Sequence, residues 1–162
     1  MEFISFEATI AKAYLWKRIY NNSQMKREAM LTRHTPDSIR SVPEAFQKIY
    51  THAVEITSPQ RLVLMSGQIG VAPDGQTLDG FEKQCHQAMD NVEALLNASD
   101  MSVADILRVT YYLTDSADLP ALSAIRTARW GSDEPPAVTT LVVAALAKPG
   151  LVVEIEVTAA RS

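Results

Sequence analysis

Two hydrophobic, β-branched runs near the end of the chain predict two strands of a sheet. They cover residues 135–143 and 151–157, and a Lys-Pro-Gly turn lies between them. The second run alternates, with apolar side chains on one face and carboxylates on the other: Val153, Ile155 and Val157 against Glu154 and Glu156. Carboxylates in such a run are typical of a solvated sheet face or of the polar wall of a pocket. We expect the first run, where Val138 and Thr140 share a face, to supply the other wall.

Three further runs earlier in the chain predict strands over residues 50–56, 61–67 and 106–114. The run at 61–67 is apolar on both faces, so we expect it near the centre of the sheet. Residues 32–43 are polar and include two prolines, which predicts a loop.

Two helices are predicted from apolar spacings of three and four. In the first, Asp79 is the expected N-cap and Glu82 completes a capping box, followed by one apolar stripe: Phe81, Cys85, Ala88, Met89, Val92, Leu95 and Leu96. In the second, Asp118 is the expected cap and Pro120 fits the first turn, followed by a shorter stripe: Leu119, Leu122, Ile125 and Trp130.

This order of elements predicts a two-layer α+β domain, in which a mixed sheet carries both helices on one face. The other face would hold apolar side chains such as Val63, Val142 and Val153. Such a face is too apolar to stay bare, which favours association through the sheet.

The N-terminal part differs from the rest, so we divide the chain into residues 1–40, a helical stretch plus a loop, and a domain at 41–162. Phe6, Ile10 and Tyr14 recur at helical spacing. We interpret this stretch as an extension outside the core, with alternative starts at Met25 or Met30. The functional alternative is a helix that docks on a partner subunit, and the sequence does not choose between them.

The amino-acid composition and net charge limit the classes of partner that the protein is expected to bind. A chain of 162 residues with 47% hydrophobic and 21% charged residues is typical of one globular domain. A net charge of −4 argues against nucleic-acid binding. No apolar run approaches the roughly 20 residues that span a bilayer. We therefore expect no membrane partner. The single cysteine, Cys85, cannot form an internal disulfide, so we expect a reducing, cytoplasmic location.

Most common chemical motifs are missing from the sequence. The three histidines, His34, His52 and His86, lie too far apart to form a recognisable metal site. Ser66 lacks the Gly-x-Ser-x-Gly context of a nucleophile elbow, and no glycine-rich phosphate loop occurs. Cys85 lies in the helix stripe and is expected to be a core residue.

Five short motifs nevertheless occur in an informative order between residues 46 and 160. They are Ser-Gly-Gln-Ile at 66–69, Tyr-Leu-Thr-Asp at 112–115, Pro-Ala at 136–137, Val-Ala-Ala-Leu at 143–146 and Val-Glu-Ile-Glu at 153–156. Together they closely resemble the RidA family, also called YjgF or L-PSP endoribonuclease. The resemblance implies a chorismate-mutase-like fold and a homotrimer with a small-molecule ligand in each intersubunit cleft. It also implies hydrolysis of reactive enamines or imines to a 2-oxo acid and ammonia, with no cofactor and no metal.

The resemblance assigns roles to individual residues. Glu154 falls on the catalytic glutamate that positions water. Four further residues fall on positions that bind the substrate in such members: Tyr50, Ser66, Gly67 and Thr140, the last through its backbone N–H. Two positions depart from the pattern. Val138 stands where an arginine grips the substrate carboxylate, and Ser123 stands where an asparagine completes the cleft.

The missing arginine leaves the function open. Loss of a charged anchor costs about 2–5 kcal/mol of binding. Arg126 or Arg129 could reach the cleft instead, but nothing in the sequence shows that either does. One hypothesis is C–N hydrolysis of a substrate other than the usual carboxylate, neutral or differently anchored. The alternative is a non-catalytic small-molecule binder or assembly subunit, and the acidic charge disfavours a ribonuclease.

Overall fold

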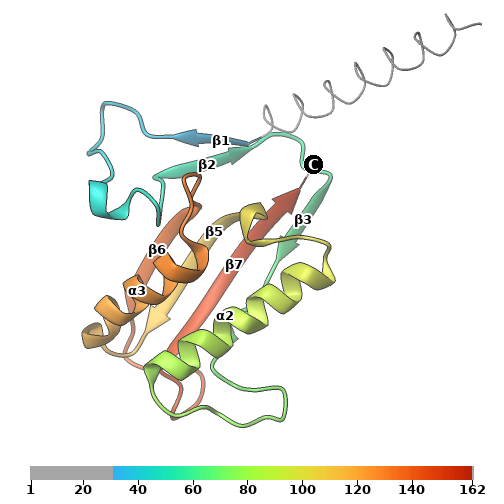
Figure 1. The fold of residues 1–162 in the computed structure, drawn as a ribbon, viewed down its shortest axis with the longest axis vertical. Helices are drawn as coiled ribbons and strands as arrows, with labels where there is room; N and C mark the ends of the chain where they lie inside the picture. The colour runs from blue at the N-terminus through green and yellow to red at the C-terminus, as the bar shows by residue number, and fades with distance from the viewer. Residues whose placement is uncertain (1–30, 162) are drawn as a thin grey trace, which may run out of the picture.

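The computed structural model describes residues 31–161, and the predicted helical stretch at residues 1–23 lies outside them (Figure 1). The main sheet has the order β3-β7-β5-β6, and β4 also pairs with β7. The strands span Arg61–Leu64 (β3), Gln68–Ile69 (β4), Ile106–Leu113 (β5), Ala137–Val142 (β6) and Val153–Arg161 (β7). Strand β6 is parallel to β5, and β7 is antiparallel to both β3 and β5, so the predicted mixed sheet is confirmed.

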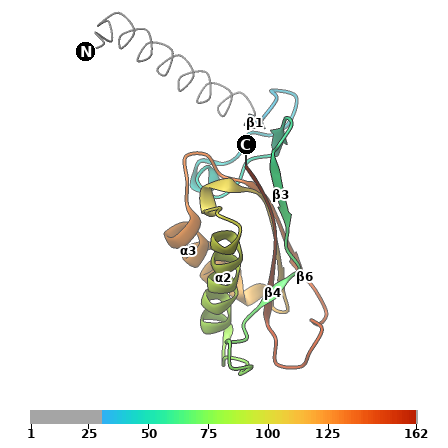
Figure 2. The same cartoon turned by 90° about the vertical axis from the view of Figure 1, so that its right-hand side faces the viewer.

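Helices α2 (Phe81–Ala98) and α3 (Leu119–Trp130) lie side by side on one face of this sheet, as Figure 2 shows. The predicted two-layer α+β fold is therefore confirmed. Within residues 31–161, no helix covers the opposite face, which we call the open face. None of the helices in this part of the chain is long and apolar enough to cross a membrane.

The core lies between the two helices and the sheet. The stripe of α2 is buried as predicted, except that Leu95 is 39% exposed. It packs on alternate residues of the two central strands: Val109, Tyr111 and Leu113 from β5, and Val153, Ile155, Val157 and Ala159 from β7. Full burial of each such large side chain contributes roughly 1.5–3 kcal/mol, so this layer holds the helices in place.

The helix starts differ from the prediction. Gly80, with φ of 82°, is the N-cap of α2, so Asp79 lies one residue too early to cap the first turn. Asp118 occupies the N-cap position of α3, but its backbone is helical and its side chain accepts no capping hydrogen bond. Asp115 caps instead, because its carboxylate accepts from the Ala117 N–H at 2.9 Å and opens a 3-10 turn, Ser116–Asp118. Pro120 lies in the first turn of α3 as expected.

The expected loop at residues 32–43 is wrong at its start, where Leu31–His34 forms strand β1. This strand pairs antiparallel with β2 (Ala53–Ile56) in a separate two-stranded sheet, and His34 Nε2 lies 2.7 Å from Glu55 Oε2. Arg33 connects this two-stranded sheet to the segment just before β6, because its Nε donates to the Pro135 carbonyl at 3.0 Å. A short strand with two exposed polar residues carries too weak an alternation to be recognised.

Strand β3 lies at the edge of the main sheet as described, not at its centre. Its Val63 packs against the core, whereas Leu62 and Leu64 lie on the open face and are 54% and 75% exposed. Val153 is likewise in the helix-covered core, and Val142 pairs with the buried Leu113, so the prediction placed these valines on the wrong face. Leu62, Leu64 and Leu141 give the open face its apolar character.

Candidate functional site

The sheet register separates the predicted site residues into two groups. Tyr112 pairs with Glu154, which places Glu154 on the open face. Val109 pairs with Val138, and Tyr111 with Thr140, which places Val138 and Thr140 on the helix-covered face. The expectation that the two C-terminal runs form facing walls is therefore wrong within one chain, because β5 lies between β6 and β7.

The first group forms a cavity of about 340 Å³ on the open face, which we call the open-face cavity. It is lined by Gly67, Tyr112, Val143, Ala145, Leu146, Ala147, Glu154 and Glu156. The Tyr112 hydroxyl donates to Glu156 Oε2 at 3.1 Å, and this hydrogen bond raises the pKa of Tyr112. Two carboxylates and a phenol thus share a cavity whose remaining wall is the apolar loop after β6.

Gly67 determines where the Glu154 carboxylate can lie. A Cβ at position 67 would overlap that carboxylate, so the side chain rests directly over the glycine backbone. Strand β4, which begins at Gln68, pairs with β7 beside Glu154 and holds this segment in place. Ser66 is exposed just before Gly67, and its carbonyl accepts from Gln68 Nε2 at 2.9 Å.

The second group lies on the helix-covered side in a cavity of about 220 Å³, which we call the arginine pocket. It is lined by Arg40, Pro43, Phe46, Tyr50, Arg126, Val138 and Thr140. Three predicted site residues meet here: Tyr50, Val138 and Thr140. The Tyr50 ring lies between Phe46, at 6.5 Å between centroids, and His52, at 5.8 Å. Ser123 is on α3 but is not one of these seven lining residues.

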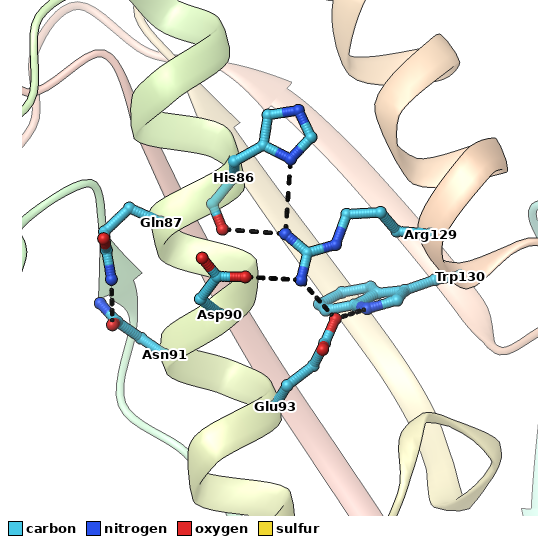
Figure 3. A network of polar contacts seen from close by, with 7 residues as sticks. All are labelled: His86, Gln87, Asp90, Asn91, Glu93, Arg129 and Trp130. Atoms are coloured by element: carbon cyan, nitrogen blue, oxygen red, sulfur yellow. Dashed lines mark hydrogen bonds and ion pairs between the residues drawn. The ribbon is translucent and has the colours of Figure 1, made fainter.

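The two arginines of α3 have different roles. Arg129 joins α3 to α2, because it donates to Asp90 and to Glu93 at 2.7 Å each and to the His86 carbonyl at 3.0 Å (Figure 3). Trp130 Nε1 donates to the same Glu93 oxygen at 2.8 Å. Burial alone would lower the pKa of Arg129, but these acidic partners raise it overall. Arg129 is therefore structural and does not line the arginine pocket.

Arg126 lies one turn earlier and lines the arginine pocket. Its guanidinium carbon is 5.8 Å from the centroid of the Tyr111 ring, a cation–π geometry. Its Nε is buried without a hydrogen-bond partner, and no carboxylate of residues 31–161 forms an ion pair with it. Burial lowers the pKa of Arg126. The sequence offers both Arg126 and Arg129 as arginines that could reach the cleft, and it does not show which of them does.

Gln84 is a structural residue that the sequence reading missed. It is 1% exposed, and its side-chain amide donates to the carbonyls of Leu78 at 2.8 Å and Gly150 at 2.7 Å and accepts from the Val152 N–H at 3.0 Å. It thereby joins α2 to the segments that precede α2 and β7. A polar residue at a buried position of the α2 stripe was the signal that could have revealed it.

Comparison with the sequence models of known families shows which family the chain belongs to. The sequence model of the family described as Endoribonuclease L-PSP matches residues 41–161. The chain belongs to the RidA, or endoribonuclease L-PSP, family. Among relatives in this family, Protein HMF1 of Saccharomyces cerevisiae is 30% identical over 118 residues, which are 72% of this chain and 88% of that protein.

Other family relatives match over shorter stretches. A 2-iminobutanoate/2-iminopropanoate deaminase of Salmonella typhimurium is 32% identical over 76 residues, 46% of this chain and 57% of that protein. A RutC family protein of Aquifex aeolicus is 35% identical over 77 residues, 47% of this chain. The matched part thus spans only 59% of the Aquifex protein's length.

Solved structures agree with the family assignment. A crystal structure of YyfB from Yersinia pestis, a protein of unknown function of the conserved Rid family, has a TM-score of 0.70 and 26% sequence identity. The likeness covers 80% of this chain and 98% of that one. Family membership and the shared fold together support a RidA-like function.

Proposed function

We propose that this protein hydrolyses an enamine, an imine or a related C–N bond of a small molecule, in clefts between the subunits of a homotrimer. The observation that carries the proposal is the Glu154 carboxylate lying over Gly67 in a cavity shared with Tyr112 and Glu156. The deaminase name of the Salmonella relative supports the reaction class.

The separation of the two groups of site residues supports an intersubunit cleft. The open-face cavity and the arginine pocket lie on opposite sides of one sheet. A cleft that uses both must therefore take Glu154 from one chain and Tyr50 and Thr140 from a neighbour. The exposed Leu62, Leu64 and Leu141 give the open face an apolar surface on which a second copy could pack.

The proposed reaction is addition of water to a C=N bond. Glu154 accepts a proton from water while the water oxygen bonds to the imine carbon, and it passes this proton to the nitrogen, which returns Glu154 to the carboxylate form. The resulting carbinolamine then releases ammonia and leaves a carbonyl group. Tyr50, Ser66 and the Gly67 backbone would hold the substrate, and the reaction requires no cofactor or metal.

We expect this chain to differ in its substrate from the family members that carry an arginine at the position of Val138. Val138 cannot grip a carboxylate, so we propose a substrate other than the usual one, either neutral or anchored by a different residue, and with a larger apolar part. We propose that residues 41–162 form the RidA-like domain and residues 1–40 an extension, whose Arg40 lines the arginine pocket. We also propose a cytoplasmic location.

The alternative is a non-catalytic binder or assembly subunit with the same fold. The same departures favour it, because Val138 and Ser123 both replace side chains that such members use to hold substrate. Under this alternative the cavities would bind a small molecule without turning it over.

An ammonia-release assay on 2-aminoacrylate generated in situ separates these functions. We expect weak turnover by the wild type, a gain in Val138→Arg, and loss of that gain when Glu154→Ala is added. Full wild-type turnover, equal to that of an arginine-bearing homologue, would overturn our interpretation of Val138. No response to either change would favour the binder.

A further inference from the structure

Arg126 is a guanidinium held in place without an anion. It is half-buried, stacks over Tyr111 and has no acidic partner among residues 31–161. Its buried Nε also lacks a hydrogen-bond acceptor. A partly desolvated cation is costly unless a counter-charge is supplied, so a site of this kind favours an anionic ligand.

The surroundings of Arg126 fit a small organic acid. Arg40 adds a second guanidinium to the arginine pocket, and Tyr50 and Thr140 add hydroxyl groups. Pro43, Phe46 and Val138 are apolar, and none of the seven lining residues is acidic. A cavity of about 220 Å³ with two cations and apolar walls matches an anionic head on an apolar body.

The helix that carries Arg126 is firmly placed. Three and four residues further on, Arg129 and Trp130 both donate to Glu93 of α2, and Arg129 also donates to Asp90 (Figure 3). These contacts fix the rotation of α3 about its axis and so hold Arg126 toward the pocket. A preorganised guanidinium of this kind can bind a carboxylate through two parallel hydrogen bonds.

We propose that Arg126, assisted by Arg40, anchors the carboxylate of the ligand and takes over the role that the resemblance assigns to an arginine at position 138. In this chain, the arginine that binds the carboxylate would therefore lie on helix α3 and not on strand β6. Val138 is part of this arrangement, because it forms an apolar wall of the same pocket. The inference rests on the proposed function and deepens it: the substrate is an imino or enamine acid whose carboxylate is held by α3.

The test measures binding of product-like acids to the full chain by calorimetry, with 2-oxobutanoate and phenylpyruvate as probes and phenylpyruvamide as the uncharged control. We expect both acids to bind and the amide to bind at least 10-fold more weakly. Arg126→Gln should weaken acid binding about 30-fold or more, which is typical of a lost charged anchor. Arg126→Lys, which keeps the charge but not the fork, should fall between.

Three controls make the result specific. Lys83→Gln removes one positive charge from the exposed surface of α2 and should leave binding unchanged. Circular dichroism and thermal unfolding of Arg126→Gln show whether the fold survives. Val138→Arg in the Arg126→Gln background should restore at least 10-fold of the lost affinity, because it returns a guanidinium to the pocket.

The outcomes separate this inference from the proposed function. If Arg126→Gln, correctly folded, binds acids like the wild type, the inference is overturned, even if imine turnover persists and the function stands. If acids bind through Arg126 but no imine or enamine is hydrolysed, the proposed function fails and the anchor stands. Equal binding of acid and amide, or no binding of either acid, would also overturn the inference.

Discussion

The two cavities of this chain differ in what they retain from the family pattern. The open-face cavity contains Glu154, which the resemblance associates with positioning water, and Gly67, which it associates with substrate binding. Glu154 lies directly over the Gly67 backbone. In the arginine pocket, Val138 stands where the resemblance places an arginine on β6, and Arg126 and Arg40 line the same pocket. Under the proposed function, reaction chemistry and ligand recognition would therefore occupy opposite sides of one sheet, so that either could change while the other stays.

Glu154→Gln should give the largest effect, since it affects only the chemical side. We expect turnover to fall by about 10²- to 10⁴-fold, the usual contribution of a general base. Acid binding, measured by calorimetry on the same preparation, should stay within about 3-fold of the wild type, because a residue on the other sheet face holds the carboxylate. Equal losses of binding and turnover would contradict the assignment of chemistry and ligand binding to different cavities.

Gly67→Ala should also reduce turnover, by roughly 10- to 100-fold, because the added methyl group pushes the Glu154 carboxylate from its place. Because the neighbour that must move is the end of a flexible side chain, urea unfolding should show only a small loss of stability. Placed in the Glu154→Ala background, Gly67→Ala should have no further effect on rate. An additive loss there would show that Gly67 acts other than through Glu154.

Gln84→Ala should destabilise the whole domain by about 3 kcal/mol, because two carbonyls and one N–H lose their buried partner. Urea unfolding measures this free energy, and Lys83→Ala, on the exposed neighbouring position, should change it by less than about 0.5 kcal/mol. Both cavities should lose function together as the domain unfolds, which distinguishes Gln84 from residues that serve only one cavity.

Alkaline pH should give the least selective effect, and one confined to the range above about pH 9. Burial raises the pKa of the Cys85 thiol from 9.0 to about 11, against a weaker opposing effect of Arg129. Between these values the unfolded chain releases the proton before the folded chain does. Stability present below pH 9 should therefore fall by up to about 3 kcal/mol toward pH 11, and Cys85→Ala should remove this part of the slope. An unchanged slope would contradict the assignment to Cys85.

Much of this architecture follows from local patterns, and the site follows only in part. The stripe of α2 and the alternation of β5 and β7 predict the two layers, because burial on one face leaves a period in the sequence. The same patterns do not say which face a strand turns toward the helices, so the prediction is wrong for Val63 and Val153. They also miss β1, whose four residues are stabilised by pairing with β2 and by Arg33.

The residues that hold ligand are the hardest to predict. Motif order predicts roles for Glu154 and Gly67, and the structure brings the two together, because Gly67 directly precedes strand β4, which pairs with β7. Arg126 and Arg129 look alike in the sequence, and only packing assigns one to the acids of α2 and leaves the other in the arginine pocket. Such a difference depends on contacts between α3 and elements distant in the chain, which no local pattern encodes.

The central claim is that one cleft uses Glu154 of one chain and Arg126 of another, and subunit complementation tests it most directly. Glu154→Gln and Arg126→Gln chains, each nearly inactive alone, are mixed in equal amounts, dissociated and reassembled. If the cleft is shared, about a quarter of the clefts in randomly mixed trimers carry both native residues, and deaminase activity should return to about that fraction of the wild type. Activity that stays at the mean of the two parents, in particles shown to be mixed trimers by native mass spectrometry, would contradict the account.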